Sequence, residues 1–297
     1  MNWTLFKKTL RDLRWPFLFV TLLLFLVQII RAMITYRVTK EVLPQFEKYG
    51  MKFETLFQII TTGSGEFIRT LVAGDGVMLN NPAHLQTFGF VDPGVVIILC
   101  IWAIGRGSAL AAELERGTME LLLAQPIARW KVIGTHVAVD LVTVPIMTIG
   151  MVIGVWAGVE LLGLEGIAIQ PYWGAALNAA GLILCLSAVT MAFAVRSRSR
   201  WRAMSWVIAA VMVMFLLTFL GQLLDWLKPW RVLSIFYFYQ PQGFVIHGRI
   251  VTPIQLGYGP DAPILYVRFI PFLYLLAVLG YTSALLGFCK RDLPAPL

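Results

Sequence analysis

Six long apolar segments constrain the fold of this chain more than any other feature of its sequence. Each is close to or longer than the roughly 20 residues with which a helix crosses the hydrocarbon core of a bilayer. Inside a bilayer, the backbone satisfies its hydrogen bonds only as a helix or in a closed barrel. No alternating barrel pattern is present, so we expect an all-α membrane protein with six transmembrane helices. The segments are Pro16–Ile34, Pro93–Ala112, Val132–Val159, Tyr172–Val195, Met204–Leu224 and Phe269–Cys289.

The positive charges indicate which ends of these helices face the cytoplasm. The connection at 160–171 carries two acids and no Lys or Arg. Cytoplasmic loops are enriched in Lys and Arg, so we expect a multi-pass protein of the cytoplasmic (inner) membrane with both termini in the cytoplasm. The net charge of +8 is then a sign of topology and not of nucleic-acid binding. The basic clusters are Lys7, Lys8, Arg11 and Arg14; Arg116, Arg129 and Lys131; Arg196, Arg198, Arg200 and Arg202; and Lys290 and Arg291.

Three stretches outside the segments complete the expected layout of a single transmembrane domain over 1–297. Residues 1–15 are apolar on one face and basic on the other, which predicts an amphipathic helix lying in the cytoplasmic interface. Pro16 would separate this helix from the first span, and one continuous helix is the alternative. Residues 36–92 and 225–268 are expected to be extracytoplasmic loops, and the many aromatic residues of the second predict a belt at headgroup level.

A charged island, residues 113–129, separates the second and third segments. Gly117 can end the helix that precedes it, Thr118 is a suitable N-cap, and Glu120 favours the first turn of a new helix. Pro126 would stop this helix after about two turns. A short helix held between two membrane spans suits insertion into a cleft of a cytoplasmic partner, although an ordinary ordered loop fits the residues as well.

The island resembles the signature that follows the second span of ABC-2-type permeases, the membrane subunits of a class of ABC transporters. The shared pattern is Glu113-x-Glu115-Arg116-Gly117-Thr118-x-Glu120-x-Leu122 and then Pro126-x-x-Arg129. The resemblance is strong over about 95–160 and extends in layout to the whole chain, with Ala128 as a departure where a serine is common. In that family the segment is a coupling helix that docks on the ATP-binding subunit. The resemblance therefore implies an ABC-2 (type V) exporter-like fold and makes these residues the docking residues of the chain.

The function implied by the resemblance is that of a permease subunit, which couples ATP hydrolysis in a separate subunit to export across the membrane. The sequence contains no Gly-x-x-x-x-Gly-Lys-Ser/Thr, so we expect no enzymatic activity and no cofactor in this chain, with ATP and Mg bound by the partner. Two ATP-binding subunits and a second permease copy, in a homodimer, would complete the assembly.

Two alternative functions remain open. The permease could transmit ATP-driven motion to an extracytoplasmic protein without transporting a substrate. More remotely, the chain could be an intramembrane enzyme, although it lacks His-Glu-x-x-His and Gly-x-Ser-x-Gly motifs and its three histidines are scattered. The three cysteines fall inside apolar segments, so we expect no metal site and no disulfide framework.

Two ionisable residues fall inside the membrane segments at matching depth. Arg106 lies about 10 Å from the polar end of the second segment, and Asp140 about 13 Å from that of the third. Either charge alone in lipid would cost several kcal/mol, which predicts that the two pair. His136 shares a helix face with Asp140 and is expected as a third member. Such a pair would either fix the packing of the two spans or sense movement of the coupling helix.

Overall fold

The computed structural model describes residues 3–48, 81–116, 128–197, 199–255 and 264–290. Within these residues, 6 helical stretches are long and apolar enough to cross a membrane, so the chain is a multi-pass helical membrane protein. Each contains one of the expected apolar segments, wholly or in large part. The stretches are built from α1 (Trp3–Arg37), α5 and α6 (Pro82–Val91 and Pro93–Gly107), α9 (Arg129–Leu162), α10 (Gln170–Arg196), α11 (Arg200–Leu223) and α13 (Phe269–Lys290).

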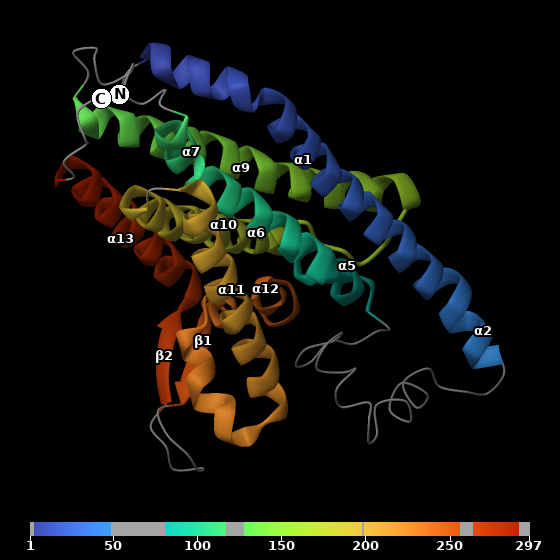
Figure 1. The fold of residues 1–297 in the computed structure, drawn as a ribbon. Coiled ribbons are helices and arrows are strands. Elements are labelled where there is room, and N and C mark those ends of the chain that lie inside the picture. The colour runs from blue at the N-terminus through green and yellow to red at the C-terminus, as the bar shows by residue number, and fades with distance from the viewer. Residues whose placement is uncertain (1–2, 49–80, 117–127, 198, 256–263, 291–297) are drawn as a thin grey trace.

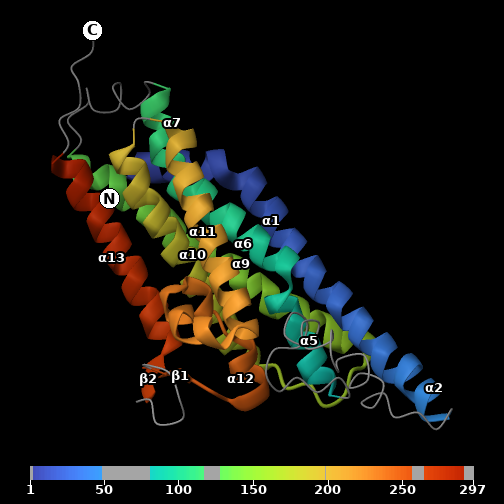
Figure 2. The same cartoon turned by 60° about the horizontal axis from the view of Figure 1, so that its bottom comes forward.

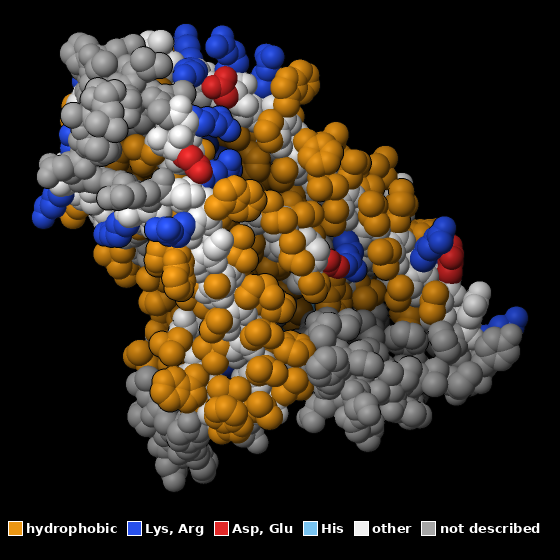
Figure 3. Space-filling view, viewed as in Figure 1, with side chains coloured by type: hydrophobic (Ala, Val, Ile, Leu, Met, Phe, Trp, Pro, Cys, Tyr) orange, Lys and Arg blue, Asp and Glu red, His pale blue; other side chains and the backbone are white. Residues whose placement is uncertain are grey.

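The long helices lie side by side in a slanted bundle (Figures 1 and 2). The central helix is α10, which packs against α6, α9, α11 and α13. The start of α1 and the end of α13 lie at the same end of the bundle, where Lys and Arg side chains gather on the face shown in Figure 3. We call this the basic end.

The first helix is continuous, so the expectation of a separate interfacial helix over 1–15 is wrong. A single helix, α1, runs from Trp3 to Arg37 and passes through Pro16. Proline removes only one backbone donor, and membrane helices tolerate it because neighbouring groups satisfy the freed carbonyl. At its far end α1 continues through a π-helical turn, η1 (Val38–Val42), into α2 (Leu43–Lys48). Residues 49–80 of the loop expected over 36–92 lie outside the described residues.

The close packing of α1 against α9 depends on glycines spaced four residues apart on α9. Gly150, Gly154 and Gly158 face α1, and a Cβ added at Gly154 would lie 2.6 Å from the carbonyl oxygen of Phe25. Contacts of small residues are how membrane helices gain packing energy in the absence of a hydrophobic driving force between them. The α1–α9 contact is the most extensive in the bundle.

This packing predicts opposite effects for two glycine-to-alanine substitutions on the same helix. Gly154→Ala should lower the melting temperature of the purified protein, because its methyl group would push against backbone atoms of α1. Gly134→Ala should leave it unchanged or raise it, since nothing lies within 4 Å and alanine favours a helix by about 1 kcal/mol. Thermal unfolding in detergent measures both. Equal effects would show that α1 does not pack on α9 through Gly154.

Two breaks interrupt the second apolar stretch. Asp92 precedes Pro93, leaves the helical region and accepts a hydrogen bond from the backbone N–H of Gly94 at 2.8 Å, so that α5 ends and α6 begins there. Near the basic end, the Ser108 hydroxyl donates to the Gly105 carbonyl at 3.0 Å, where α6 gives way to α7 (Ala109–Glu115). Such serine back-bonding bends helices. The expected span to Ala112 is therefore two helices.

The described residues of the stretch 225–268, which are 225–255 and 264–268, fold against the bundle at the end opposite the basic end. They contain η2 (Asp225–Leu233), η3 (Ile235–Phe238), α12 (Pro241–His247) and an antiparallel hairpin of β1 (Val251–Gln255) and β2 (Ile264–Arg268), in which Val251 pairs with Arg268. Trp226, Trp230 and Tyr266 are exposed. Phe236, Phe238 and Tyr239 are buried in the protein, so the expectation of a belt at headgroup level is wrong for these three.

Candidate functional site

A buried carboxylate, Asp140, connects four helices in the half of the bundle nearer the basic end. Arg106 of α6 donates from Nε to Oδ1 of Asp140 at 2.8 Å, and the two side chains are 6% and 0% exposed. Ser187 of α10 and Tyr281 of α13 donate their hydroxyl protons to Oδ2 at 2.8 and 3.0 Å. Asp140 itself belongs to α9. The structure thus places Arg106 and Asp140 in direct contact and adds two donors that the sequence did not indicate.

In this network the negative charge of Asp140 is balanced by Arg106, and both carboxylate oxygens accept hydrogen bonds. A charge taken out of water is tolerated when an opposite charge and hydrogen bonds replace its hydration. Asp140 has both, because one of its oxygens receives the guanidinium and the other receives two hydroxyl groups. The network can therefore join α6, α9, α10 and α13 without leaving the carboxylate unsatisfied.

His136 lies one turn before Asp140 on α9, but its ring is not part of the ion pair. Its backbone carbonyl accepts from Nη2 of Arg106 at 3.5 Å, while its ring Nε2 lies 3.7 Å from Oε2 of Glu113 on α7. The expectation that the imidazole is a third member of the Arg106–Asp140 pair is therefore wrong. The ring instead faces the helix that leads into the charged island.

Four of the expected docking residues lie in the described part of the chain: Glu113, Glu115, Arg116 and Arg129. Arg129 begins α9, and Glu115 and Arg116 are exposed at the end of α7. The Oε2 atom of Glu115 accepts from the backbone N–H of Arg200 at 3.2 Å, where the N-terminus of α11 favours an acid. Gly117, Thr118, Glu120, Leu122 and Pro126 lie outside the described residues.

The charge state of Glu113 follows from its surroundings. Burial raises the pKa of Glu113, but contact with His136 and the positive charges of His136, Lys8 and Arg106 outweigh burial and leave the pKa below its usual value. Glu113 is therefore ionised at neutral pH. Because a lowered carboxyl pKa stabilises the folded state only above the pKa of the unfolded chain, this contribution is lost as the pH falls through the lowered value.

A second ion pair, missed by the sequence analysis, lies towards the opposite end of the bundle. Arg31 of α1 pairs with Asp92, the residue that caps α6. Beside it, Nε2 of the buried Gln28 donates to the carbonyl of Gly89 at 2.7 Å. The apolar run around Arg31 indicated only that this side chain could reach the interface. The signal that could have found its partner is Asp92 itself, an acid placed directly before Pro93 at the start of a span.

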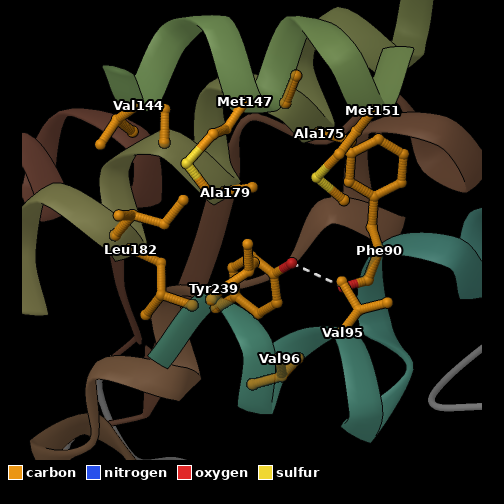
Figure 4. Packing of buried hydrophobic residues seen from close by; sticks show 14 of the residues in the cluster. Phe90, Val95, Val96, Val144, Met147, Met151, Ala175, Ala179, Leu182 and Tyr239 are labelled. Atoms are coloured by element: carbon orange, nitrogen blue, oxygen red, sulfur yellow. Dashed lines mark hydrogen bonds between the residues drawn. The ribbon is translucent and has the colours of Figure 1, made fainter. Parts of the chain in front are cut away.

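Hydrogen bonds of a serine, an asparagine and a tyrosine hold the buried part of the 225–268 stretch. The Ser234 hydroxyl donates to the carbonyl of Met214 on α11 at 2.8 Å. Asn178 of α10 donates from Nδ2 to the carbonyl of Phe238 at 3.0 Å and accepts from the N–H of Gln240 at 2.9 Å. The Tyr239 hydroxyl donates to the carbonyl of Phe90 at 2.7 Å, and its ring lies among apolar side chains of α6, α9 and α10 (Figure 4). We call residues 234–240 the aromatic plug. It packs against α11 and α13 and is bonded to Asn178 of α10 at the end opposite the basic end.

None of these clusters has the composition of a metal centre. Among the described residues, no group of three or more His, Cys, Asp or Glu side chains could hold a metal ion. The described residues instead form a structural connection. A buried network is centred on Asp140, and two helices, α7 and α9, flank the island on either side of it in the chain.

Comparison with known proteins gives a match to a family model. A family model described as multidrug efflux system permease Rv1217c, C-terminal domain, matches residues 83–242, more than half of the 297 residues. The matched region runs from α5 into α12 and includes Arg106, Asp140, the island and the aromatic plug. No curated protein and no solved structure matches the chain.

Proposed function

Since this chain belongs to the family described by the C-terminal domain of the multidrug efflux system permease Rv1217c, we propose that it is the membrane subunit of an ABC efflux transporter of the ABC-2 (type V) kind. ATP hydrolysis takes place in a separate subunit, and this chain converts it into export of a substrate. The observation that carries the proposal is the family match over a region that contains the island with its ABC-2-like pattern.

The contacts of the island's two arms support a role in transmitting force. The first arm, α7, contacts α9 through Glu113 and His136 and contacts α11 through Glu115. The second arm is the start of α9, which carries Asp140. A displacement of the island would therefore move α9 and α11 directly. It would move α6, α10 and α13 through their hydrogen bonds to Asp140. This coupling uses rigid helices and hydrogen bonds that are already in place.

The proposed assembly contains two copies of this permease and two ATP-binding subunits in the inner membrane, with the basic end and both termini in the cytoplasm. Basic residues at that end agree with this orientation. The island would then lie on the side where ATP is hydrolysed, and the aromatic plug on the far side of the membrane. The chain supplies no cofactor; ATP and Mg would belong to the partner.

Transmission to an extracytoplasmic protein is the second candidate function. It is favoured by the ordered structure of the 225–268 stretch, whose described residues form three short helices and a hairpin anchored to α10 through Asn178. In this case the bundle would move the plug and hairpin instead of opening a path for a substrate.

Transport by inside-out membrane vesicles distinguishes the two candidates. Vesicles that contain the chain and its native partners should accumulate amphipathic dyes, or a labelled drug from a panel, when ATP is added. Vesicles without the chain, or with a non-hydrolysable ATP analogue, should not. ATP hydrolysis that depends on the chain but moves no compound of the panel would favour transmission, and no chain-dependent hydrolysis would contradict both.

A further inference from the structure

Three positively charged side chains at the start of α1 are exposed and form one stripe. Lys7, Arg11 and Arg14 are four and three residues apart, so they lie on the same face of the helix. Figure 3 shows Lys and Arg side chains where α1 begins at the basic end. In the part of the chain that the structure describes, none of the three forms an ion pair with an acid. We call these three residues the basic stripe.

The bundle fixes the direction in which the basic stripe points. Leu5 precedes Lys7 by two residues and therefore lies about 200° around the helix from it. Leu5 is buried in a cluster with apolar side chains of α7 and α9. The neighbouring cation, Lys8, acts on Glu113 of α7, and Asp12 lies about 100° from the nearest member of the stripe. The basic stripe therefore faces away from the bundle.

The same face of α1 is apolar beyond the basic stripe. Leu18 and Leu22 follow Arg14 at intervals of four residues and are 54% and 55% exposed. Large apolar side chains of α1 stay exposed as far as Ile34. In a membrane helix, lipid chains cover such a surface. A molecule that lies against both the basic stripe and Leu18 must therefore carry a negative charge and an apolar chain.

The length of the exposed apolar part places the basic stripe at the level of the lipid headgroups. Trp15, which is 69% exposed, and Arg37, which is also exposed, bound this part. Between them α1 is about 33 Å long, close to the roughly 30 Å of the hydrocarbon core of a bilayer. The basic stripe occupies the next ~12 Å of the helix beyond Trp15. The surface potential of anionic lipids, which decays over about 10 Å, still acts there.

Two members of the basic stripe lie over tryptophan rings. Nζ of Lys7 is 5.3 Å from the centroid of the Trp3 ring, and Cζ of Arg14 is 5.4 Å from that of the Trp15 ring. Tryptophan is enriched at the interface between lipid and water, and clusters of Lys and Arg bind anionic headgroups. The stripe thus combines the two residue types that favour the headgroup layer.

We propose that the basic stripe binds anionic phospholipids, with their phosphate groups against Lys7, Arg11 and Arg14 and their acyl chains along Leu18 and Leu22. The class of ligand follows from the two parts of this surface. A soluble phosphate would use the cations alone, and a neutral lipid would use the apolar part alone. Bound lipid would hold the start of α1 at the membrane surface. The proposal requires the bundle to lie in a membrane and does not depend on export or on an ATP-binding subunit.

Native mass spectrometry of the purified full chain in detergent tests the proposal. The protein is titrated with phosphatidylglycerol and, separately, with phosphatidylcholine that has the same acyl chains. The wild type should bind phosphatidylglycerol at least about tenfold more tightly, because each cation near an anionic surface contributes about fivefold. The combined variant Lys7→Gln, Arg11→Gln and Arg14→Gln should lose most of this preference.

Two control variants separate the charge of the stripe from its packing and from the net charge. In the first, the lysine of the stripe becomes arginine and both arginines become lysine, which keeps the charges and should keep the preference. In the second, Arg37→Gln, Lys40→Gln and Lys48→Gln remove the same charge at the other end of the continuous helical stretch. These three residues are also exposed, and the preference should survive their loss.

Three results would overturn the proposal. The first is equal binding of both lipids by the wild type, or an equal loss of preference in the second control and the stripe variant. The second is displacement of phosphatidylglycerol by an equal concentration of glycerol 3-phosphate, which would make the stripe a site for soluble anions. The third is a stripe variant that keeps the lipid preference and loses a co-purifying protein, which would assign the stripe to a protein partner.

Discussion

Asp140→Leu is expected to reduce the amount of folded protein more than any other single substitution in the bundle. It would remove the ion-pair partner of Arg106, whose side chain is 6% exposed. Breaking a buried pair by removing one partner costs about 3–5 kcal/mol. Arg106→Leu should cost less, because Asp140 then keeps the two hydrogen bonds that it accepts from the hydroxyl groups of Ser187 and Tyr281.

The double variant Arg106→Leu with Asp140→Leu should yield more folded protein than Asp140→Leu alone, since it removes both charges. Size-exclusion chromatography of detergent-extracted membranes measures the folded fraction. Asp12→Leu, at an exposed position on α1, is the control and should leave the yield unchanged. A double variant with losses equal to the sum of the two singles would show that the residues act independently.

Asn178→Leu is expected to release the aromatic plug. The substitution leaves the carbonyl of Phe238 and the N–H of Gln240 without their partner on α10, and each unsatisfied buried group costs about 1–3 kcal/mol. Hydrogen–deuterium exchange of a peptide covering 235–240 should become faster by about 30-fold or more, because each 1.4 kcal/mol corresponds to a factor of ten.

Tyr274→Phe supplies the matched control for the plug. It removes an exposed hydroxyl that donates to Leu177, the neighbour of Asn178, and should leave the exchange of 235–240 unchanged. Unchanged exchange in Asn178→Leu would mean that Ser234, Tyr239 and their neighbours hold the plug without the asparagine.

The parts of the fold that sequence predicted are those that depend on one helix at a time. Six apolar runs suffice to indicate six membrane helices, because lipid leaves the backbone few alternatives. Counting residues from the polar ends of the two segments also predicted that Arg106 and Asp140 lie at a similar depth in the membrane. The two side chains are in contact. Depth can be read from a sequence at 1.5 Å per residue.

The parts that were missed depend on how helices are rotated and which segments return to the bundle. Ser187 and Tyr281 lie on α10 and α13, and no sequence pattern shows that both hydroxyls face Asp140. The ring of His136 shares a helix face with Asp140, yet it is directed towards Glu113. Aromatic residues suit both a headgroup belt and a protein interior, so composition could not distinguish the buried Tyr239 from the exposed Trp226.

The docking function of the island stays a prediction, because Gly117, Thr118, Glu120, Leu122 and Pro126 lie outside the described residues. Glu115 has an internal contact with Arg200, so a substitution there would disturb the chain as well as any partner. Glu120 is therefore the better position for a test, and Glu160, at the far end of α9, is a matched control.

Co-purification from native membranes tests the central claim most directly. The chain is extracted in mild detergent, its partners are identified, and ATPase activity is measured. We predict a stoichiometric ATP-binding subunit with ATPase activity, lost in Glu120→Lys and kept in Glu160→Lys. A chain that purifies without any ATPase in several mild detergents would contradict the account.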